Sequence, residues 1–239
     1  MNSLLARPGE LLSKHLLRVA ELAERLADDL RLGLGEQARI AGALHDLGKG
    51  DAGAQERYAS HVKALPSSWT RKRRTGAPGH EIVSFAVAYG ILEKLGLPKG
   101  DIAVILLAIL RHHQAMATLD ERLSELDRRK WFKGKADLSA LSSIVSSALG
   151  RQVSIESWPR NREELRKTAM QVWQRCCHDA RGDLRVQLRA KLLTGVVIAA
   201  DYHVASASGG SGRRSRFSVE LERFFESLEK LKREVGSGG

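Results

Sequence analysis

Apolar residues recur every three or four positions along most of the chain, the spacing that places them on one face of a helix. The first such stripe runs through Leu12, Leu16 and Val19 and stops before Gly33. We find no convincing alternation of period two, the signature of strands. The pattern therefore predicts an all-α fold, with helices over about residues 8–31, 36–47, 79–95, 102–110, 119–129, 137–149, 162–178 and 183–205.

Three segments depart from this pattern. Residues 49–79 are rich in turn-forming and basic residues and predict a long loop with at most one helical turn. Residues 206–216, rich in Gly, Ser and Arg, predict a flexible basic linker. Apolar residues then return at helical spacing and predict an amphipathic helix over residues 217–235. We expect one domain over residues 1–205, with this last helix packed on it; the alternative is a helix that binds a partner.

Composition places the chain among soluble proteins. Hydrophobic residues make up 43% of it, enough for a substantial core. No apolar run reaches the roughly 18 to 20 residues of a membrane span, and the first 20 residues lack the pattern of a signal peptide. The two cysteines, Cys176 and Cys177, are adjacent, which excludes a disulfide framework. We expect a cytoplasmic protein without membrane contact.

The net charge of the chain indicates an anionic binding partner. The chain has 39 Lys and Arg against 28 Asp and Glu, a formal net charge of +11, which favours binding to a polyanion such as nucleic acid. Two clusters mix cations with aromatic side chains, the combination that follows a single strand and stacks its bases, although such runs are often only solvated faces. The candidate contacts are Arg71, Lys72, Arg73, Arg74, Arg128, Arg129, Lys130 and Trp131.

Seven side chains of the types that bind divalent transition metals are spread along the predicted helices. They are His15, His45, Asp46, His80, His112, His113 and Asp201. A single inward histidine is usually a core residue, but a buried carboxylate is costly unless a cation compensates it. No Lys or Arg is obviously placed to do so for Asp46 or Asp201. Metal ions would supply that charge, so the set predicts a metalloenzyme.

A second His-Asp pair, His178 and Asp179, tests whether the pattern is specific. It lies in a polar stretch at a helix end, whereas His45 and Asp46 lie in an apolar one. We therefore exclude the second pair from the site.

The order and spacing of these residues resemble the HD phosphohydrolase superfamily, and more narrowly the HD nuclease of CRISPR type I interference systems. The resemblance covers residues 15–201, and one departure is Gln114, where many members have Gly. It rests on His15, on His45 and Asp46 followed by Leu-Gly-Lys, on His80 with Glu81 and Ser84, on adjacent His112 and His113, and on Asp201.

The resemblance implies an HD-domain helical bundle with two buried metal ions. His15, His45, Asp46 and Asp201 would hold the first ion. Asp46 would bridge to a second ion held by His80, His112 and His113. Ligands of nitrogen and oxygen suit Mn, Ni, Co, Fe or Zn.

The resemblance also implies hydrolysis of phosphodiester bonds in single-stranded DNA, with a separate helicase and the CRISPR surveillance complex as partners. Two ions would activate a water for in-line attack on phosphorus, so no side-chain nucleophile is needed. Asp46 and Lys49 are the catalytic candidates, with Lys49 placed to contact a phosphate oxygen; its alternative role is a cation at a helix end. Ser84 is a candidate substrate contact.

Two other functions remain open from the sequence. The same scaffold carries nucleotide phosphohydrolases and cyclic-dinucleotide phosphodiesterases, although the Gly-Tyr-Pro signature of the latter is absent. A non-catalytic DNA-binding scaffold is the alternative of another class, and the complete ligand set argues against it. Because only the linker and one helix follow Asp201, we expect a stand-alone nuclease subunit or an excised domain.

Overall fold

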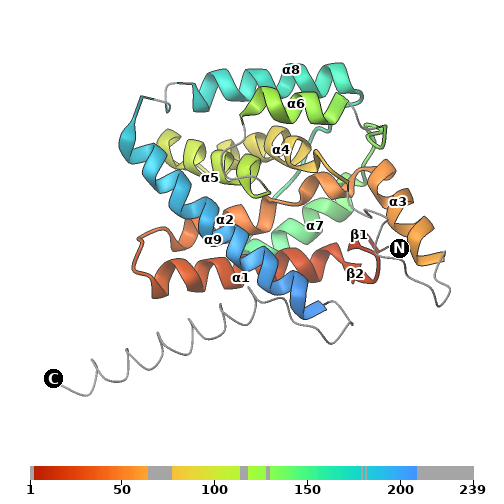
Figure 1. Ribbon diagram of the computed structural model, residues 1–239, viewed down its shortest axis with the longest axis horizontal. Coiled ribbons are helices and arrows are strands. Elements are labelled where there is room, and N and C mark those ends of the chain that lie inside the picture. The colour runs from red at the N-terminus through yellow and green to blue at the C-terminus, as the bar shows by residue number, and fades with distance from the viewer. Residues whose placement is uncertain are drawn as a thin grey trace.

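The computed structural model describes residues 3–63, 77–113, 118–127, 130–178, 180 and 182–208, and within these ranges the fold is a helical bundle (Figure 1). The prediction of an all-α fold is confirmed, apart from one short hairpin. The helices are α1 (Leu12–Asp29), α2 (Gly35–Leu44), α3 (Ala52–Lys63), α4 (His80–Lys94), α5 (Lys99–Arg111), α6 (Leu119–Asp127), α7 (Leu138–Leu149), α8 (Arg162–Val172) and α9 (Leu184–Ser208).

Helix α5 forms the centre of the bundle. All residues from 102 to 110 are buried, as their unbroken apolar run predicts. The helix packs against α2, α4 and α9, while α1 packs against α2, α7 and α9. Helices α6 and α8 lie over α4 at the top of the view in Figure 1. Helix α9 also contacts α2, so α2, α5 and α9 all meet within the bundle.

The first predicted helix begins later than expected. Residues before it form an antiparallel hairpin of β1 (Leu5–Arg7) and β2 (Glu10–Leu11), so α1 starts at Leu12 rather than near residue 8. The hairpin turns at Pro8 and Gly9, and Gly9 has φ +85°, a conformation that favours glycine. A Pro-Gly pair is a turn signal, and its meaning here was missed.

The prediction of a long loop over residues 49–79 is also partly wrong. It contains a 3-10 turn over Leu47–Gly50 and then α3, a helix of three turns. The buried carboxylate of Asp51 joins these elements to a later segment, because it accepts hydrogen bonds from the backbone N–H groups of Lys133, Gly134 and Lys135 at 2.9 to 3.2 Å. Residues 130–136 are thereby fixed against the start of α3.

Two further predictions concern the C-terminal region. Helix α9 continues to Ser208, beyond the predicted start of the linker at residue 206. The rest of that linker and the amphipathic helix predicted over residues 217–235 lie outside the described residues. Among the described residues, no helix combines the length and the apolar character needed to cross a membrane.

Candidate metal centre

The carboxylate of Asp46 lies at the centre of the seven predicted ligands. Helix α2 ends at Leu44, so His45 and Asp46 occupy the turn that leads into Leu47–Gly50 rather than the helix itself. Both side chains are fully buried. Asp46 Oδ2 lies 3.1 Å from His15 Nε2 and 3.3 Å from His45 Nε2. Its other oxygen, Oδ1, lies 2.6 Å from His80 Nε2 and 3.6 Å from His112 Nε2.

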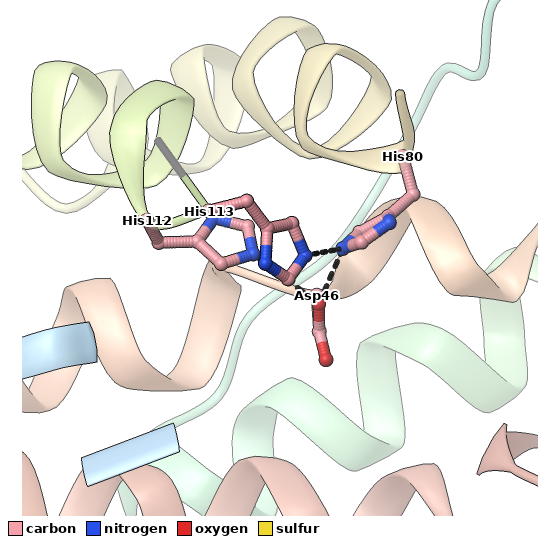
Figure 2. A group of neighbouring side chains, drawn as sticks. All are labelled: Asp46, His80, His112 and His113. Carbon is pink, nitrogen blue, oxygen red and sulfur yellow. Dashed lines mark hydrogen bonds and ion pairs between the residues drawn. The ribbon is translucent and has the colours of Figure 1, made fainter. Parts of the chain in front are cut away.

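The two oxygens of Asp46 thus face two different groups of donors, and in each group the candidate donor atoms all lie within 4.8 Å of one another. One group is His15, His45, Asp46 and Asp201; the other is Asp46, His80, His112 and His113. Figure 2 shows the second group, with His80 at the start of α4 and the two adjacent histidines at the end of α5. The structure therefore brings together all seven side chains that the sequence singled out.

Backbone carbonyls orient three of the imidazoles. Nδ1 of His45 lies 2.8 Å from the carbonyl oxygen of Gly42, and Nδ1 of His112 lies 2.7 Å from that of Ile109. His80 makes the same contact with Ala77 at 2.6 Å. Since a carbonyl only accepts hydrogen bonds, each Nδ1 carries a proton, which leaves Nε2, the nitrogen that faces Asp46, as the atom that can bind a metal. This is the tautomer that a metal ligand requires.

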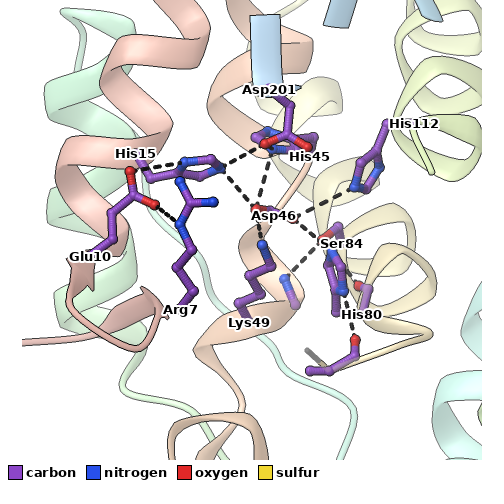
Figure 3. Close-up of polar contacts among 12 residues, drawn as sticks. Arg7, Glu10, His15, His45, Asp46, Lys49, His80, Ser84, His112 and Asp201 are labelled. Atoms are coloured by element: carbon purple, nitrogen blue, oxygen red, sulfur yellow. Dashed lines mark hydrogen bonds and ion pairs between the residues drawn. The ribbon is translucent and has the colours of Figure 1, made fainter. Parts of the chain in front are cut away.

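The other ligands come from more distant parts of the chain. His15 on α1 has Nε2 3.3 Å from Asp201 Oδ1, and Asp201 is supplied by α9 (Figure 3). On its other side, His15 Nδ1 lies 3.6 Å from Glu10 Oε1 in the hairpin. His113, more exposed than the other ligands, has Nε2 3.2 Å from His80 Nε2.

These residues fit a pair of divalent ions. His45 Nε2 and His112 Nε2 are buried and make no hydrogen bond among the described residues, which is costly unless another partner takes the lone pair. Two nitrogen or oxygen ligands of one ion at about 2.1 Å lie roughly 3.0 to 3.4 Å apart in octahedral or tetrahedral geometry. Three separations in the first group, 3.1 to 3.3 Å, fall in this range, whereas His45 Nε2 and Asp201 Oδ1 are 3.8 Å apart. In the second group the contacts of Asp46 Oδ1 with His80 and His112, 2.6 and 3.6 Å, lie on either side of it.

The first group carries strongly coupled charges. Burial disfavours the imidazolium form of His15, but the neighbouring carboxylates, that of Asp201 first, outweigh this effect and raise its pKa to about 10. His45 behaves in the same way. Burial disfavours its charged form, but the negative charge of Asp46 outweighs this effect and raises the pKa of His45 to about 9. Protons and a metal ion therefore compete for the same Nε2 atoms.

Burial alone would raise the pKa of Asp46, but His45 and Lys49 hold it well below its usual value. In the second group the balance is reversed, because burial lowers the pKa of His112 and of His113, which keeps both rings neutral. The carboxylate at the centre is thus charged, and the rings of His112 and His113 in the second group are neutral.

The profile of the HD domain family matches residues 12–148, more than half of the chain. The chain belongs to the HD domain family. The matched range includes His15, the His45-Asp46 pair, His80 and the double histidine, whereas Asp201 lies beyond it and is brought to the site by α9. The predicted resemblance is confirmed at the level of this family, whose members are metal-dependent hydrolases.

The fold of this HD domain is similar to that of the CRISPR-associated Cas3 HD domain protein from Methanocaldococcus jannaschii. The two structures superpose with a TM-score of 0.53 and 18% sequence identity, over 84% of this chain and 100% of that chain. No curated protein matches the sequence.

Lys49, a predicted catalytic residue, lies beside the HD pair. Its Nζ forms an ion pair with Asp46 Oδ2, and its side chain lines a cavity of about 210 Å³ that opens onto three of the candidate ligands, His15, His113 and Asp201. Burial opposes the charged form of Lys49, but Asp46 outweighs this and raises its pKa above the ordinary value. A cation here was not expected to neutralise Asp46, so the sequence prediction that no Lys or Arg serves this carboxylate is wrong.

Two predicted substrate contacts have other roles. Ser84 is fully buried, accepts a hydrogen bond from Gly48 N at 2.9 Å and donates to the carbonyl of His80 at 3.1 Å. Trp131 is 4% exposed, and its indole donates to the carbonyl of Pro78 at 2.8 Å. In this conformation neither side chain can contact a DNA strand, because both are buried and hydrogen-bonded within the protein.

The remaining predicted contacts divide in two. Lys130 is exposed. Arg71, Lys72, Arg73, Arg74, Arg128 and Arg129 lie outside the described residues.

Other residues near the site were missed. Glu10 and Arg7 come from the unpredicted hairpin, and Gln55 from the unpredicted helix α3. Arg122 pairs with the buried Glu81 at 2.9 Å, behind His80. A helical pattern could not identify the first three, because none lies on an apolar stripe.

Binding of metal should be visible in stability. We expect Mn²⁺ added to chelator-treated protein to raise Tm by about 5–10 °C. A ligand at 100 times its Kd stabilises by about 2.7 kcal/mol, and each kcal/mol is worth about 2–4 °C in a chain of this size. Calorimetry with and without excess chelator measures the shift. An equal shift in the Asp46→Asn variant would place the bound ion elsewhere.

Proposed function

We propose that this HD domain is a metal-dependent nuclease that hydrolyses phosphodiester bonds of single-stranded DNA in CRISPR type I interference. It would act in the cytoplasm with a separate helicase and the surveillance complex. The observation that carries the proposal is the position of Asp46, whose two oxygens face two separate groups of metal-ligand side chains. One carboxylate shared in this way is the arrangement needed to hold two ions side by side.

Two divalent ions, when bound by these ligands, would activate water and neutralise charge that develops on a phosphodiester. His15, His45 and Asp201 would hold one ion, and His80, His112 and His113 the other, with Asp46 common to both. The Nδ1 contacts to backbone carbonyls keep the rings in place during the reaction. Lys49, at the edge of the cavity, would contact a non-bridging oxygen of the phosphate.

The size of the cavity favours a polymer over a small molecule. At about 210 Å³ it is smaller than the roughly 300–1,000 Å³ of sites that enclose a complete small ligand. It suits a phosphodiester with its sugars and bases extending outside, rather than an enclosed nucleotide or cyclic dinucleotide. The net charge of +11 and the similarity to a Cas3 HD domain fold support nucleic acid as the polymer.

The test is cleavage by the full chain after chelation and reloading with Mn, Ni, Co, Fe, Zn or Mg. Circular and linear single-stranded DNA, duplex DNA, RNA, deoxynucleoside triphosphates and a cyclic dinucleotide are offered separately. We expect a transition metal to support cleavage of single-stranded DNA, and the circular substrate reveals internal cutting. Consumption of nucleotides with intact DNA would replace the proposal by a nucleotide phosphohydrolase. Metal binding and cleavage both absent under all conditions would indicate a scaffold.

Lys49 offers a specific prediction for this mechanism. We expect Lys49→Ala to lower kcat about 10²- to 10³-fold with little change in metal content, because a cation aimed at developing charge acts mainly in the transition state. Lys14→Ala, which removes an exposed cation from α1, is the matched control and should retain wild-type kcat. Steady-state cleavage of a labelled oligonucleotide measures both. If Lys49→Ala instead loses metal, its role is to hold Asp46.

A further inference from the structure

The N-terminal hairpin is tied to the turn that carries Asp46 and Lys49. Gln55 of α3 accepts a hydrogen bond from Leu5 N at 2.8 Å and donates to the carbonyl oxygen of Leu5 at 2.8 Å. The same amide nitrogen lies 2.6 Å from the carbonyl oxygen of Lys49. One side chain thus links the backbone of β1 to the residue at the edge of the metal centre. The position of the hairpin is therefore fixed relative to the ligands.

Arg7 leaves this hairpin toward the metal centre. Its Nε lies 2.5 Å from Glu10 Oε2, and the other oxygen of Glu10 lies 3.6 Å from His15 Nδ1 (Figure 3). The carboxylate of Glu10 is 9% exposed, so it stands between a cation and a metal ligand with little contact with water. Glu10 thus places a negative charge beside the His15 ring and holds the guanidinium at the same time, although at 3.6 Å it is not hydrogen-bonded to Nδ1.

One end of that guanidinium is unused. Nη2 of Arg7 is shielded from water and makes no hydrogen bond within the described part of the chain, although the side chain as a whole is 33% exposed. A shielded donor without an acceptor is unfavourable, and an anionic oxygen is the acceptor that suits it best. Arg7 lines the cavity of about 210 Å³ together with Lys49, His15, His113, Asp201 and Tyr202. The accessible part of the Arg7 side chain therefore belongs to the wall of the space where a phosphodiester would lie.

We propose that Arg7 is a phosphate-binding residue of this centre, with Glu10 holding its guanidinium at the cavity so that it donates to a phosphate oxygen of the bound strand. The proposal rests on the proposed nuclease function and adds a contact that does not involve the metal ligands. Lys49 lines the same cavity and is tied to Asp46 rather than to Glu10. The two cations thus reach the cavity from separate anchors.

Binding and metal content together test the proposal. The probe is a fluorescein-labelled 20-residue oligothymidylate, titrated by anisotropy in an Asp46→Asn background so that cleavage does not interfere. We expect adding Arg7→Ala to weaken binding about tenfold, the loss typical of one hydrogen bond to a charged group. Arg18→Ala removes an exposed arginine of α1 that does not line this cavity, and it should change binding less than twofold. Arg7→Lys keeps the positive charge but lacks the planar guanidinium, and its binding should be intermediate between those of Arg7→Ala and Arg18→Ala.

In the chain with Asp46 intact, Arg7→Ala should lower kcat/KM for the oligonucleotide about tenfold while metal content by mass spectrometry stays at the wild-type value. Binding equal to that of Arg18→Ala would overturn the proposal. Loss of metal in Arg7→Ala would also overturn it, because Arg7 would then serve only to hold Glu10 and His15. A parent protein that neither binds nor cleaves single-stranded DNA is a different result, since it refutes the proposed function itself.

Discussion

Asp46→Asn is expected to reduce cleavage about a thousandfold or more and to lower metal content well below that of the wild type. The amide is neutral and has one oxygen, so it cannot present oxygens to both His15 and His80, which lie on opposite sides of the carboxylate at 3.1 and 2.6 Å. Both groups lose their shared charge at once, and the electrostatic stabilisation of the transition state goes with it. Metal analysis and single-turnover cleavage of a labelled oligonucleotide provide the two measurements.

The matched control for Asp46→Asn is His178→Ala. His178 belongs to the other His-Asp pair of the chain, is exposed and is in neither group of candidate ligands. It should keep wild-type metal content and cleavage. If Asp46→Asn kept its metal and its activity, the two-group assignment would be wrong. If His178→Ala lost them, the exclusion of the second pair would be wrong.

The sequence was sufficient to single out the seven side chains that the structure brings together, because their chemistry conflicts with their surroundings. Histidines and aspartates on apolar helices need compensation, and His15, His80 and His112 are each at most 3% exposed. The order of the ligands along the chain also gave the correct family. The sequence did not predict which helices pack against each other. Asp201 lies outside the family match, and only the packing of α9 on α1 and α5 brings it to His15.

The elements that the sequence did not predict are short or lack an apolar stripe. Residues 5–11 contain too few positions for a period to show, and the hairpin depends on one Pro-Gly turn and on Gln55, 50 positions away from Leu5. Arg7 and Glu10 were consequently absent from the predicted site. A contact between residues so distant in sequence leaves no local signal.

Residue type also failed to predict exposure. Trp131 was grouped with neighbouring cations as a surface for bases, yet the carboxylate of Asp51 fixes the backbone of residues 133–135 and the indole turns inward to Pro78. Ser84 was predicted as a substrate contact, and in the structure it is buried. Its hydroxyl joins Gly48 N to the carbonyl of His80, and so links the turn after Asp46 to the start of α4.

Gly48→Ala is expected to disrupt that junction. A Cβ at this position would lie 2.1 Å from the carbonyl oxygen of His80 and 2.9 Å from Val83 Cβ, so the turn after Asp46 and the start of α4 would have to separate. Overpacking of this kind costs about 1–3 kcal/mol. Because Asp46 Oδ1 and His80 Nε2 are only 2.6 Å apart across this contact, a displacement of about 1 Å should lower kcat about 100-fold. Urea unfolding and single-turnover cleavage measure the two effects.

Gly90→Ala separates this close contact from the general effect of replacing a glycine near α4. Gly90 is an exposed residue of the same helix, and no atom would meet an added Cβ within 4 Å. Alanine there should stabilise the protein by about 0.5–1 kcal/mol, because it favours the helix without a clash. Cleavage and metal content should remain those of the wild type. If Gly48→Ala destabilises the protein and Gly90→Ala stabilises it, the contact between the Asp46 turn and α4 sets the distance across the metal centre. Equal effects of the two substitutions on stability and cleavage would show that it does not.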